Sequence, residues 1–528
     1  MVQQKRNNGS MTRRDFLKVA GAGTGLLVLE ACVPSAPSPA ATVAPAGEGQ
    51  RGGKLRWATT REPAGPFDPA LSVAPPATIL TQWIHEPLVD IDEEYANTIP
   101  RLAESWEPEQ DGQAWVFHLR QGVEFHHGRE FVADDVVHTF QRILDPDFGS
   151  PGLAVYERIE NIEKLDNHTV RFALAGANAD FPVQLAAFQG KIVPHDLTNE
   201  QIDQEPRGTG PFKIDKYAHA DRITLQRNEN YWVEGIPYLD EIESVHIPEQ
   251  ATLANALEAG DVDVFNLPSG EFVELLQDKP GIALAFTPPM RKQQMFMQLD
   301  MEPFNDDRVR RAFKLIGDRV VMTEVAHPNI PARPDDDNPV IPPSPFRIDT
   351  NIWNQDLEEA KRLIAEAGYE AGLEVTLWAI NDAPGILDFC LVFADWAKEI
   401  GVTVEIEGVS ASRYYAEKWL QVPFGTVEWS PRPTADEQLR VAYTSDAAWN
   451  ESHFYNPEFD RKLDEALGET DFERRKELYA ELQHTLIEEG GQIIPYHLPQ
   501  MAAIRDVVQN YKFHPLNWLD PRNVWLEA

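Results

Sequence analysis

Helical and extended patterns alternate in the second half of the chain, and no other feature of the sequence constrains the fold as strongly. Residues 356–367 carry apolar side chains at helical spacing, and residues 373–378 then alternate apolar and polar side chains as a strand does. A further helix is expected over residues 385–400 and a further strand over residues 402–406. Because strands separated by helices usually lie parallel, this order predicts a parallel sheet covered by helices.

The first half of the chain is richer in strands. Residues 54–59 and 115–120 alternate as strands do, whereas residues 134–144 place their apolar side chains on one helical face. A last helix is expected over residues 471–489. A chain of 528 residues exceeds the size of a single hydrophobic core. We therefore expect an α/β protein with two lobes.

Residues 1–31 have the features of an export signal. Arg13 and Arg14 precede a Phe-Leu-Lys sequence, as in signals of the twin-arginine type. The apolar stretch that follows, residues 19–29, is too short to cross a bilayer core of about 30 Å. These residues therefore predict a cleaved twin-arginine signal.

The segment after the signal predicts a lipid-anchored protein. The residues that end at Cys32 resemble a lipobox, in which the cysteine becomes the lipidated first residue of the mature chain. Residues 32–52 are rich in Pro, Ala and Gly, a composition typical of a tether. We expect an exported protein, periplasmic or at the cell surface, that the lipid alone attaches to the membrane.

Composition excludes several classes of protein. The chain has 47 basic and 85 acidic residues, a formal net charge of −38, so nucleic acid is a poor partner. Apart from Cys32 the only cysteine is Cys390, which lies in an apolar run and is expected to be a buried thiol. His126 and His127 are neighbours in an extended stretch, so they face opposite ways and cannot hold one metal ion. We expect no catalytic residue, no metal site and no cofactor.

Six short motifs follow one another along the chain. They are PRLAESWE (100–107), WVFHLRQGVEFHHG (115–128), GTGPF (208–212), LEAGDVD (257–263), DRVRRAF (307–313) and NPEFD (456–460). Together they resemble the family 5 extracellular solute-binding proteins, the receptor subunits of dipeptide, oligopeptide and nickel ABC importers. His127 stands where that family usually has an aspartate.

The resemblance implies a fold and a function. It implies a two-lobe clamshell with an enlarged first lobe, in which the chain crosses the hinge twice and the ligand is enclosed between the lobes. We expect residues 53–287 and 492–528 to form the first lobe and residues 288–491 the second. The implied protein is a monomer that captures a peptide or small solute and delivers it to ABC permease subunits.

The resemblance also directs attention to residues 428–436. In peptide-binding members, an aspartate in a Trp-x-x-Asp loop holds the amino group of the peptide, but here Arg432 stands near that position. A guanidinium suits a carboxylate or phosphonate, so the inverted charge favours an acidic solute. Alternatively, Asp436 pairs with Arg432 and makes the site neutral.

Other side chains are expected to line the ligand site. Pockets for small molecules are mostly apolar with a few placed polar groups, and the same loop region offers aromatic and amide side chains. A loop of the first lobe and the start of a second-lobe strand complete the prediction. The candidate ligand-binding residues are Arg432, Trp429, Asp436, Trp449, Asn450, Phe67, Asp68 and Arg291.

Two alternatives to the importer stay open at this point. One is a receptor of the same fold that reports its ligand to a signalling partner. The other is an exported peptide scavenger or folding helper of broad specificity. The identity of the ligand is also open, because this fold serves peptides, opines, sugars and metal chelates.

Overall fold

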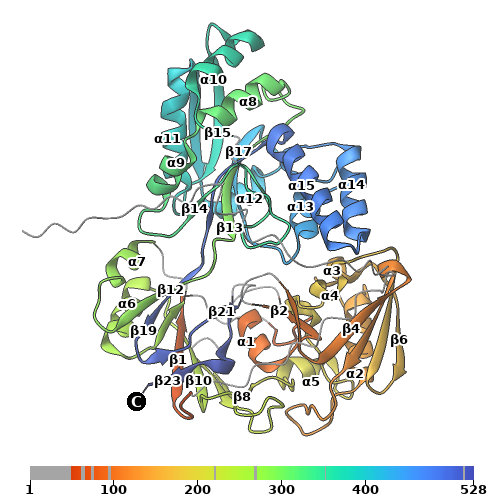
Figure 1. The fold of residues 1–528 in the computed structure, drawn as a ribbon. Coiled ribbons are helices and arrows are strands. Elements are labelled where there is room, and N and C mark those ends of the chain that lie inside the picture. Colours follow the sequence, from red (N-terminus) through yellow and green to blue (C-terminus); the bar gives the residue numbers. More distant parts are fainter. Residues whose placement is uncertain are drawn as a thin grey trace, which may run out of the picture. The chain divides into compact units, whose positions relative to one another are not determined.

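Figure 1 shows the computed structural model of the protein, in which residues 49–60, 66–72, 77–92, 97–218, 222–266, 270–350, 353–514 and 518–527 are described. The predicted signal, Cys32 and most of the predicted tether lie outside these residues. Among the described residues, no helix is both long enough and apolar enough to cross a membrane.

The first lobe contains a mixed seven-stranded sheet and a separate antiparallel sheet. The strand order of the larger sheet is β12-β19-β11-β1-β10-β9-β8, and β1 lies parallel to both of its neighbours. Its strands are β1 (Lys54–Thr59), β8 (Phe212–Ala218), β9 (Arg222–Arg227), β10 (Glu241–His246), β11 (Val264–Asn266), β12 (Ile282–Phe286) and β19 (Met501–Arg505). The smaller sheet has the order β4-β5-β7-β6 and consists of β4 (Ala103–Glu109), β5 (Ala114–Leu119), β6 (Ile159–Asp166) and β7 (Thr169–Leu174).

Short helices and hairpins complete the first lobe. The helices are α1 (Ala77–Ile84), α2 (Ala133–Leu144), α3 (Leu153–Tyr156), α4 (Phe181–Gln184), α5 (Asn199–Gln204), α6 (Gln250–Ala259) and α7 (Gly270–Leu276), with 3₁₀ turns η2 (Gln110–Gly112), η3 (Phe188–Gly190) and η5 (Pro521–Asn523). Three two-stranded pairs are β2 (Val89–Ile91) with β3 (Thr98–Pro100), β20 (Val508–Gln509) with β23 (Trp525–Leu526), and β21 (Phe513–His514) with β22 (Trp518–Leu519).

The second lobe is built on one six-stranded sheet with the order β14-β18-β13-β17-β15-β16. Its strands are β13 (Arg291–Met297), β14 (Arg333–Pro334), β15 (Leu373–Ile380), β16 (Val402–Val409), β17 (Phe424–Trp429) and β18 (Gln492–Leu498). Its helices are α8 (Asp307–Ile316), α9 (Arg319–Ala326), α10 (Leu357–Ile364), α11 (Ile386–Glu399), α12 (Ala411–Glu417), α13 (Ala435–Tyr443), α14 (Pro457–Gly468) and α15 (Phe472–Glu489), with a π turn η4 (Ala365–Tyr369) after α10.

Alternating side chains place helices on both faces of this sheet. Phe424 of β17 belongs to an apolar core that includes residues of α8, α9, α10 and α11. Val427 and Trp429, which point the other way, belong to a second core with α13, α14 and α15. Cys390 of α11 is a buried free thiol, as predicted, and burial raises its pKa.

The predicted elements occur close to their expected positions. β1, β5, β15 and β16 are strands, and α2, α10, α11 and α15 are helices, with ends that differ from the predicted ranges by a few residues. α2 forms as expected because Val136, Phe140 and Ile143 bury one face. Oδ2 of Asp135 also accepts a hydrogen bond from the backbone N of Val132 at 2.9 Å, which caps the first turn.

The sheet of the second lobe differs from the prediction because it is mixed. β15 lies parallel to β16 and β17, as the alternation predicts, but β13 and β17 are antiparallel, as are β13 and β18. The difference arises because β13 and β18 are the strands that continue to and from the first lobe. Such pairings between distant segments leave no local pattern in the sequence.

The chain also returns from the second lobe to the first at a later residue than expected. Residues 492–528 were assigned to the first lobe, but β18 (Gln492–Leu498) pairs with β13 and β14 in the sheet of the second lobe. β19 then pairs with β11 and β12 in the first sheet. The chain therefore passes between the sheets after Leu498 rather than before Gln492.

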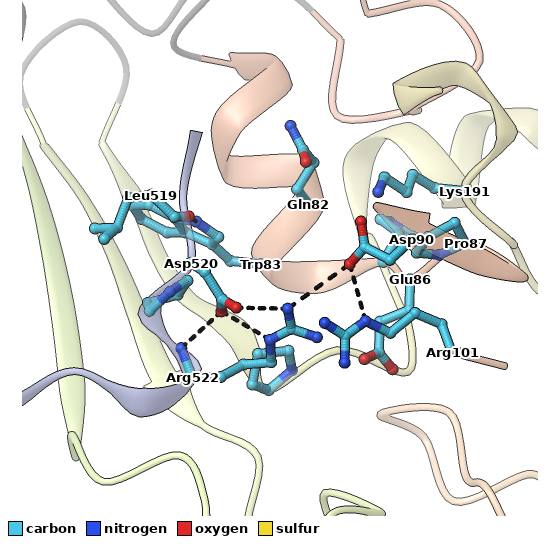
Figure 2. A pocket seen from close by; sticks show the side chains of 13 residues that line it. Gln82, Trp83, Glu86, Pro87, Asp90, Arg101, Lys191, Leu519, Asp520 and Arg522 are labelled. Atoms are coloured by element: carbon cyan, nitrogen blue, oxygen red, sulfur yellow. Dashed lines mark hydrogen bonds and ion pairs between the residues drawn. The ribbon is translucent and has the colours of Figure 1, made fainter. Parts of the chain in front are cut away.

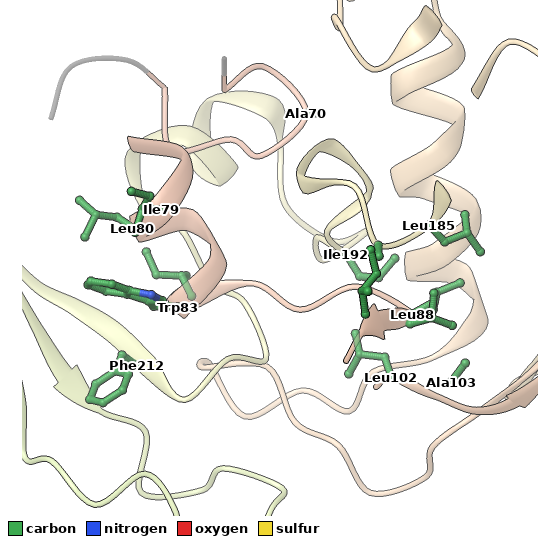
Figure 3. Close-up of a cluster of buried hydrophobic side chains, with 14 of the residues drawn as sticks. Ala70, Ile79, Leu80, Trp83, Leu88, Leu102, Ala103, Leu185, Ile192 and Phe212 are labelled. Atoms are coloured by element: carbon green, nitrogen blue, oxygen red, sulfur yellow. The ribbon is translucent and has the colours of Figure 1, made fainter. Parts of the chain in front are cut away.

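A helix packed on the first sheet positions the glycine-rich motif. Figure 3 shows Ile79, Leu80 and Trp83 of α1 beside Phe212 of β8, all within one buried cluster. A Cβ at Gly208 would lie 1.8 Å from the carbonyl oxygen of the last α1 residue, so only glycine fits at that position. The motif thus packs against the C-terminal end of α1.

Candidate functional site

The candidate site begins where β17 ends. Trp429 is the last residue of β17 and is nearly buried. The chain then turns, and the side chain of Thr434 accepts a hydrogen bond from the backbone N of Glu437 at 3.0 Å, which starts α13. Residues 430–434 are therefore held between a central strand and a capped helix.

Three tryptophans gather beside this loop. The ring of Trp449 lies 5.8 Å from that of Trp429 and 6.0 Å from that of Trp419, both distances between centroids. Trp449 is 39% exposed, whereas Trp429 is 8% exposed, so the cluster presents one aromatic face to solvent. A rigid aromatic face of this kind is typical of small-molecule sites.

Arg432 lies over this aromatic face. Its guanidinium carbon is 5.6 Å from the centroid of the Trp449 ring, a cation–π arrangement. The side chain is half-buried, and this burial lowers the pKa of its guanidinium, opposed by the nearby Glu437 carboxyl. Among the described residues, no carboxylate comes within ion-pair distance of Arg432. Its hydrogen-bond donors therefore remain available for an anion.

Asp436 does not form the alternative pair with Arg432. Asp436 is buried and pairs with Arg440, with Nη2 to Oδ1 at 2.8 Å and Nε to Oδ2 at 3.0 Å. The two residues are four positions apart on α13, so they meet on one face of the helix. Asp436 is thus occupied within its own helix and is not brought to the aromatic face.

Glu451 holds two tryptophans of the aromatic face in place. It was not among the residues predicted from the sequence. Its carboxylate is buried and accepts hydrogen bonds from Nε1 of Trp419 at 3.0 Å and Nε1 of Trp429 at 3.1 Å. Nε2 of Gln294 donates a further bond at 2.6 Å. Burial raises the pKa of Glu451 to about 7 and lowers that of the nearby Lys292 to about 7. A carboxylate therefore fixes two of the three indoles.

Asn450 shapes the turn that carries Trp449. Its Nδ2 donates to the carbonyl oxygens of Thr444 at 3.1 Å and Phe454 at 2.9 Å. Its Oδ1 accepts a hydrogen bond from the backbone N of Phe454 at 2.9 Å. The side chain is buried and holds the loop, so its contacts are structural in this form of the protein.

Arg291 begins β13 and lies on the opposite face of the second-lobe sheet from Trp429, because its neighbour Lys292 is the register partner of Trp429. Its Nη2 lies 3.1 Å from Oε1 of Glu428, which also accepts a hydrogen bond from Nε2 of Gln293 at 2.8 Å. Glu428 precedes Trp429 in β17, so the two side chains point to different faces. Arg291 therefore lies one residue from the position in β13 that pairs with Trp429, but its side chain is on the other face and is not part of the aromatic cluster.

Phe67 and Asp68 lie in the core of the first lobe. Both are buried, and Asp68 forms an ion pair with Arg142 of α2 while accepting a hydrogen bond from the backbone N of Ala70 at 3.0 Å. The backbone N of Phe67 donates to Oδ1 of Asp203 at 2.7 Å. These contacts anchor the loop, and the structure does not bring either residue to Arg432.

A small cavity of about 40 Å³ lies at the C-terminal end of α1 (Figure 2). Asp90 pairs there with Nε of Arg101 at 2.9 Å and with Nη2 of Arg522 at 3.7 Å. Burial lowers the pKa of Lys191 to about 8, and the pairing of Asp520 with Arg522 lowers that of the carboxyl to about 2. These contacts attach the C-terminal segment to the first lobe, and the cavity is of a size to hold water.

In the part of the chain that the structure describes, no three His, Cys, Asp or Glu side chains form a group that could hold a metal ion. The β17 loop brings together an aromatic face and one available guanidinium. Such an arrangement can bind an anion or a carboxylate-bearing solute.

Comparisons with known proteins agree with this architecture. The family described as bacterial extracellular solute-binding proteins, family 5 Middle, matches residues 97–451. The chain is 29% identical over 530 residues to heme-binding protein A of Haemophilus influenzae, covering 93% of this chain and 96% of that one. It is also 29% identical over 507 residues to a dipeptide-binding protein of Pseudomonas aeruginosa, covering 88% and 93%.

Solved structures show the same fold. The periplasmic binding protein DppA of Helicobacter pylori, in complex with the peptide STSA, matches with a TM-score of 0.74 and 25% identity over 91% of this chain and 99% of that one. HbpA2 of Haemophilus parasuis matches with a TM-score of 0.82 and 22% identity over 90% and 100%. The two-lobe α/β fold and the family resemblance are thereby confirmed, and the chain belongs to the family 5 bacterial extracellular solute-binding proteins.

Proposed function

We propose that this protein is the extracytoplasmic substrate-binding subunit of an ABC importer, and that it captures a peptide or small acidic solute between its lobes. It delivers the solute to permease subunits in the membrane and performs no chemistry on it. Family membership supports the class of function, and similar proteins are named for dipeptides or were solved with a peptide.

The single observation that supports an acidic ligand is that the guanidinium of Arg432 has no ion-pair partner in the part of the chain that the structure describes. Its guanidinium lies over Trp449 without a carboxylate partner among the described residues. A half-buried cation without a counter-ion costs free energy, and an anionic ligand group would supply the missing partner. Trp429, Trp449 and Arg432 are the proposed ligand contacts of the second lobe. Asn450 and Glu451 are proposed to hold them in place.

The same proposal includes the way the protein is held outside the cell. Residues 1–31 would be a twin-arginine signal and Cys32 the lipidated first residue of a monomer attached through a flexible tether. The lobe built on the seven-stranded sheet and the lobe built on the six-stranded sheet would close on the solute. Closure is a hinge motion that a ligand favours by touching both lobes only in the closed form.

Ligand-dependent stability tests this proposal. We expect the melting temperature of the solute-free protein to rise with one class among dipeptides, glutamate-containing peptides, opine-like acids, oligosaccharides, hemin and nickel chelates. A ligand at 100 times its Kd adds about 2.7 kcal/mol to the free energy of unfolding. A rise confined to acidic solutes would support the proposal. Equal, weak rises with every peptide would favour the scavenger, and a protein that no solute stabilises would contradict both.

A further inference from the structure

The first lobe contacts the second lobe through residues 177–184, away from the strands that connect the lobes. The backbone N of Ala179 donates a hydrogen bond to the carbonyl oxygen of Leu467, near the end of α14, at 2.8 Å. Phe181 belongs to the apolar core of the first lobe, whereas Leu467 ends a helix of the second. Figure 1 shows α4 directly beside the ends of α13, α14 and α15. This segment is a second bridge between the lobes.

An ion pair joins the two lobes at this second bridge. Asp180 pairs with Arg475 of α15, and both side chains are about nine-tenths buried. The guanidinium carbon of Arg475 is 4.7 Å from the ring centroid of Phe346, so the cation is packed as well as paired. Oδ1 of Asn178 accepts a hydrogen bond from the backbone N of Asp180 at 2.9 Å, which holds the backbone that carries the carboxylate.

The bridge also reaches the helix that follows the Arg432 loop. Glu437, in the first turn of α13, lies close enough to Gln184 of α4 for the amide to influence the carboxyl, while burial raises the pKa of that carboxyl. The backbone of the Arg432 loop is in turn held by α13, because Nε2 of Gln438 donates to the carbonyl oxygen of Arg432 at 2.9 Å. The contact between the lobes and the candidate ligand loop therefore share one helix.

The ion pair is only partly satisfied, which suits a contact that has to open. Oδ2 of Asp180 and Nε of Arg475 are buried, and neither has a hydrogen-bond partner among the described residues. Removing two charges from water offsets most of what such an incomplete pairing returns, whereas removing one partner would leave the other charge buried and unpaired. Its net free energy is therefore small, and separation of the lobes would return both charges to water.

We propose that Asp180 and Arg475 form a latch between the lobes that favours the closed form and has to open when the solute is released. Because a ligand that binds only the closed form has an apparent affinity scaled by the closed fraction, loss of the latch weakens binding without any change in the ligand contacts. Neither Asp180 nor Arg475 is a proposed ligand contact, so the latch can be tested in solute-free protein, independently of the proposed function.

Disulfide trapping tests the latch. A Cβ at Gly468 of α14 would lie 3.4 Å from Cβ of Ala177, close to the Cβ separation in disulfides. In solute-free protein carrying Cys32→Ser, we expect Ala177→Cys with Gly468→Cys to form an intrachain disulfide under oxidised glutathione. Arg475→Met, which keeps the packing but removes the charge, should slow formation about tenfold, which corresponds to about 1.4 kcal/mol.

Arg474→Met is the matched control, because the neighbouring Arg474 is exposed and, within the described part of the chain, pairs with glutamates of its own lobe. It should leave the rate unchanged. The buried thiol of Cys390 reports folding of the second lobe, because it should stay unreactive toward a thiol reagent in each variant. If Arg475→Met exposes Cys390, Asp180→Asn takes its place. Equal rates in the latch and control variants, or no disulfide in any of them, would overturn the proposal.

Discussion

Replacing Arg432 by alanine is expected to weaken the binding of an acidic solute by about 100-fold or more. Truncating one partner of a desolvated charge pair costs about 2–5 kcal/mol, and each 1.4 kcal/mol is a factor of ten in Kd. The melting temperature of the solute-free protein should change little, because Arg432 has no ion pair to lose within the described structure. Isothermal titration with the most stabilising acidic solute measures the change.

Two further variants separate the charge from the shape of the side chain. Arg432→Lys keeps the charge but not the planar fork, so it should recover only part of the affinity. Arg413→Ala is the matched control, because Arg413 is an exposed arginine of the same lobe that pairs with Glu417 on α12. A solute whose affinity is the same in Arg432→Ala and Arg413→Ala would show that Arg432 is structural.

Replacing Glu451 by alanine is expected to destabilise the second lobe by about 3 kcal/mol or more. The change leaves the buried donors of Trp419, Trp429 and Gln294 without their acceptor, at about 1–3 kcal/mol for each unpaired group. Chemical denaturation measures the loss of stability. A shift in the wavelength of tryptophan emission reports the changed surroundings of the Trp419 and Trp429 indoles. The exposed Glu407 of β16 offers a control, since Glu407→Ala should stay within about 0.5 kcal/mol.

The effect of Glu451 has a definite pH dependence. Burial raises its pKa from 4.5 to about 7, so between these values the folded protein keeps a proton that the unfolded chain has released. Its contribution to the free energy of unfolding is therefore complete below pH 4.5 and is lost as the pH rises through 7. The cost of Glu451→Ala should be larger at pH 5 than at pH 8. A cost that grows with pH would contradict this assignment.

Local patterns explain which parts of the fold could be predicted. β1, β15 and α11 follow directly from alternation or helical periodicity, because each element satisfies its own pattern by burying one face. The antiparallel pairing of β13 with β17 and β18 joins segments far apart in the chain, so no local signal announces it. The assignment of β18 to the first lobe failed for the same reason.

The candidate site was predicted unevenly for similar reasons. The loop with Trp429 and Arg432 was selected through a motif. The pair of Asp436 with Arg440 was not anticipated, although their spacing is that of a pair on one helical face. Glu451 could not have been predicted, because its three donors come from separate strands and loops. A buried carboxylate is recognised only when the segments around it are brought together.

Small-angle X-ray scattering with and without the most stabilising solute tests the central claim most directly. A solute that is enclosed between two lobes stabilises the closed form, so the radius of gyration should fall when the solute saturates the protein. The same solute should produce a smaller change at equal concentration in Arg432→Ala, because less of the protein is bound. Tight binding with an unchanged scattering curve would contradict capture by lobe closure.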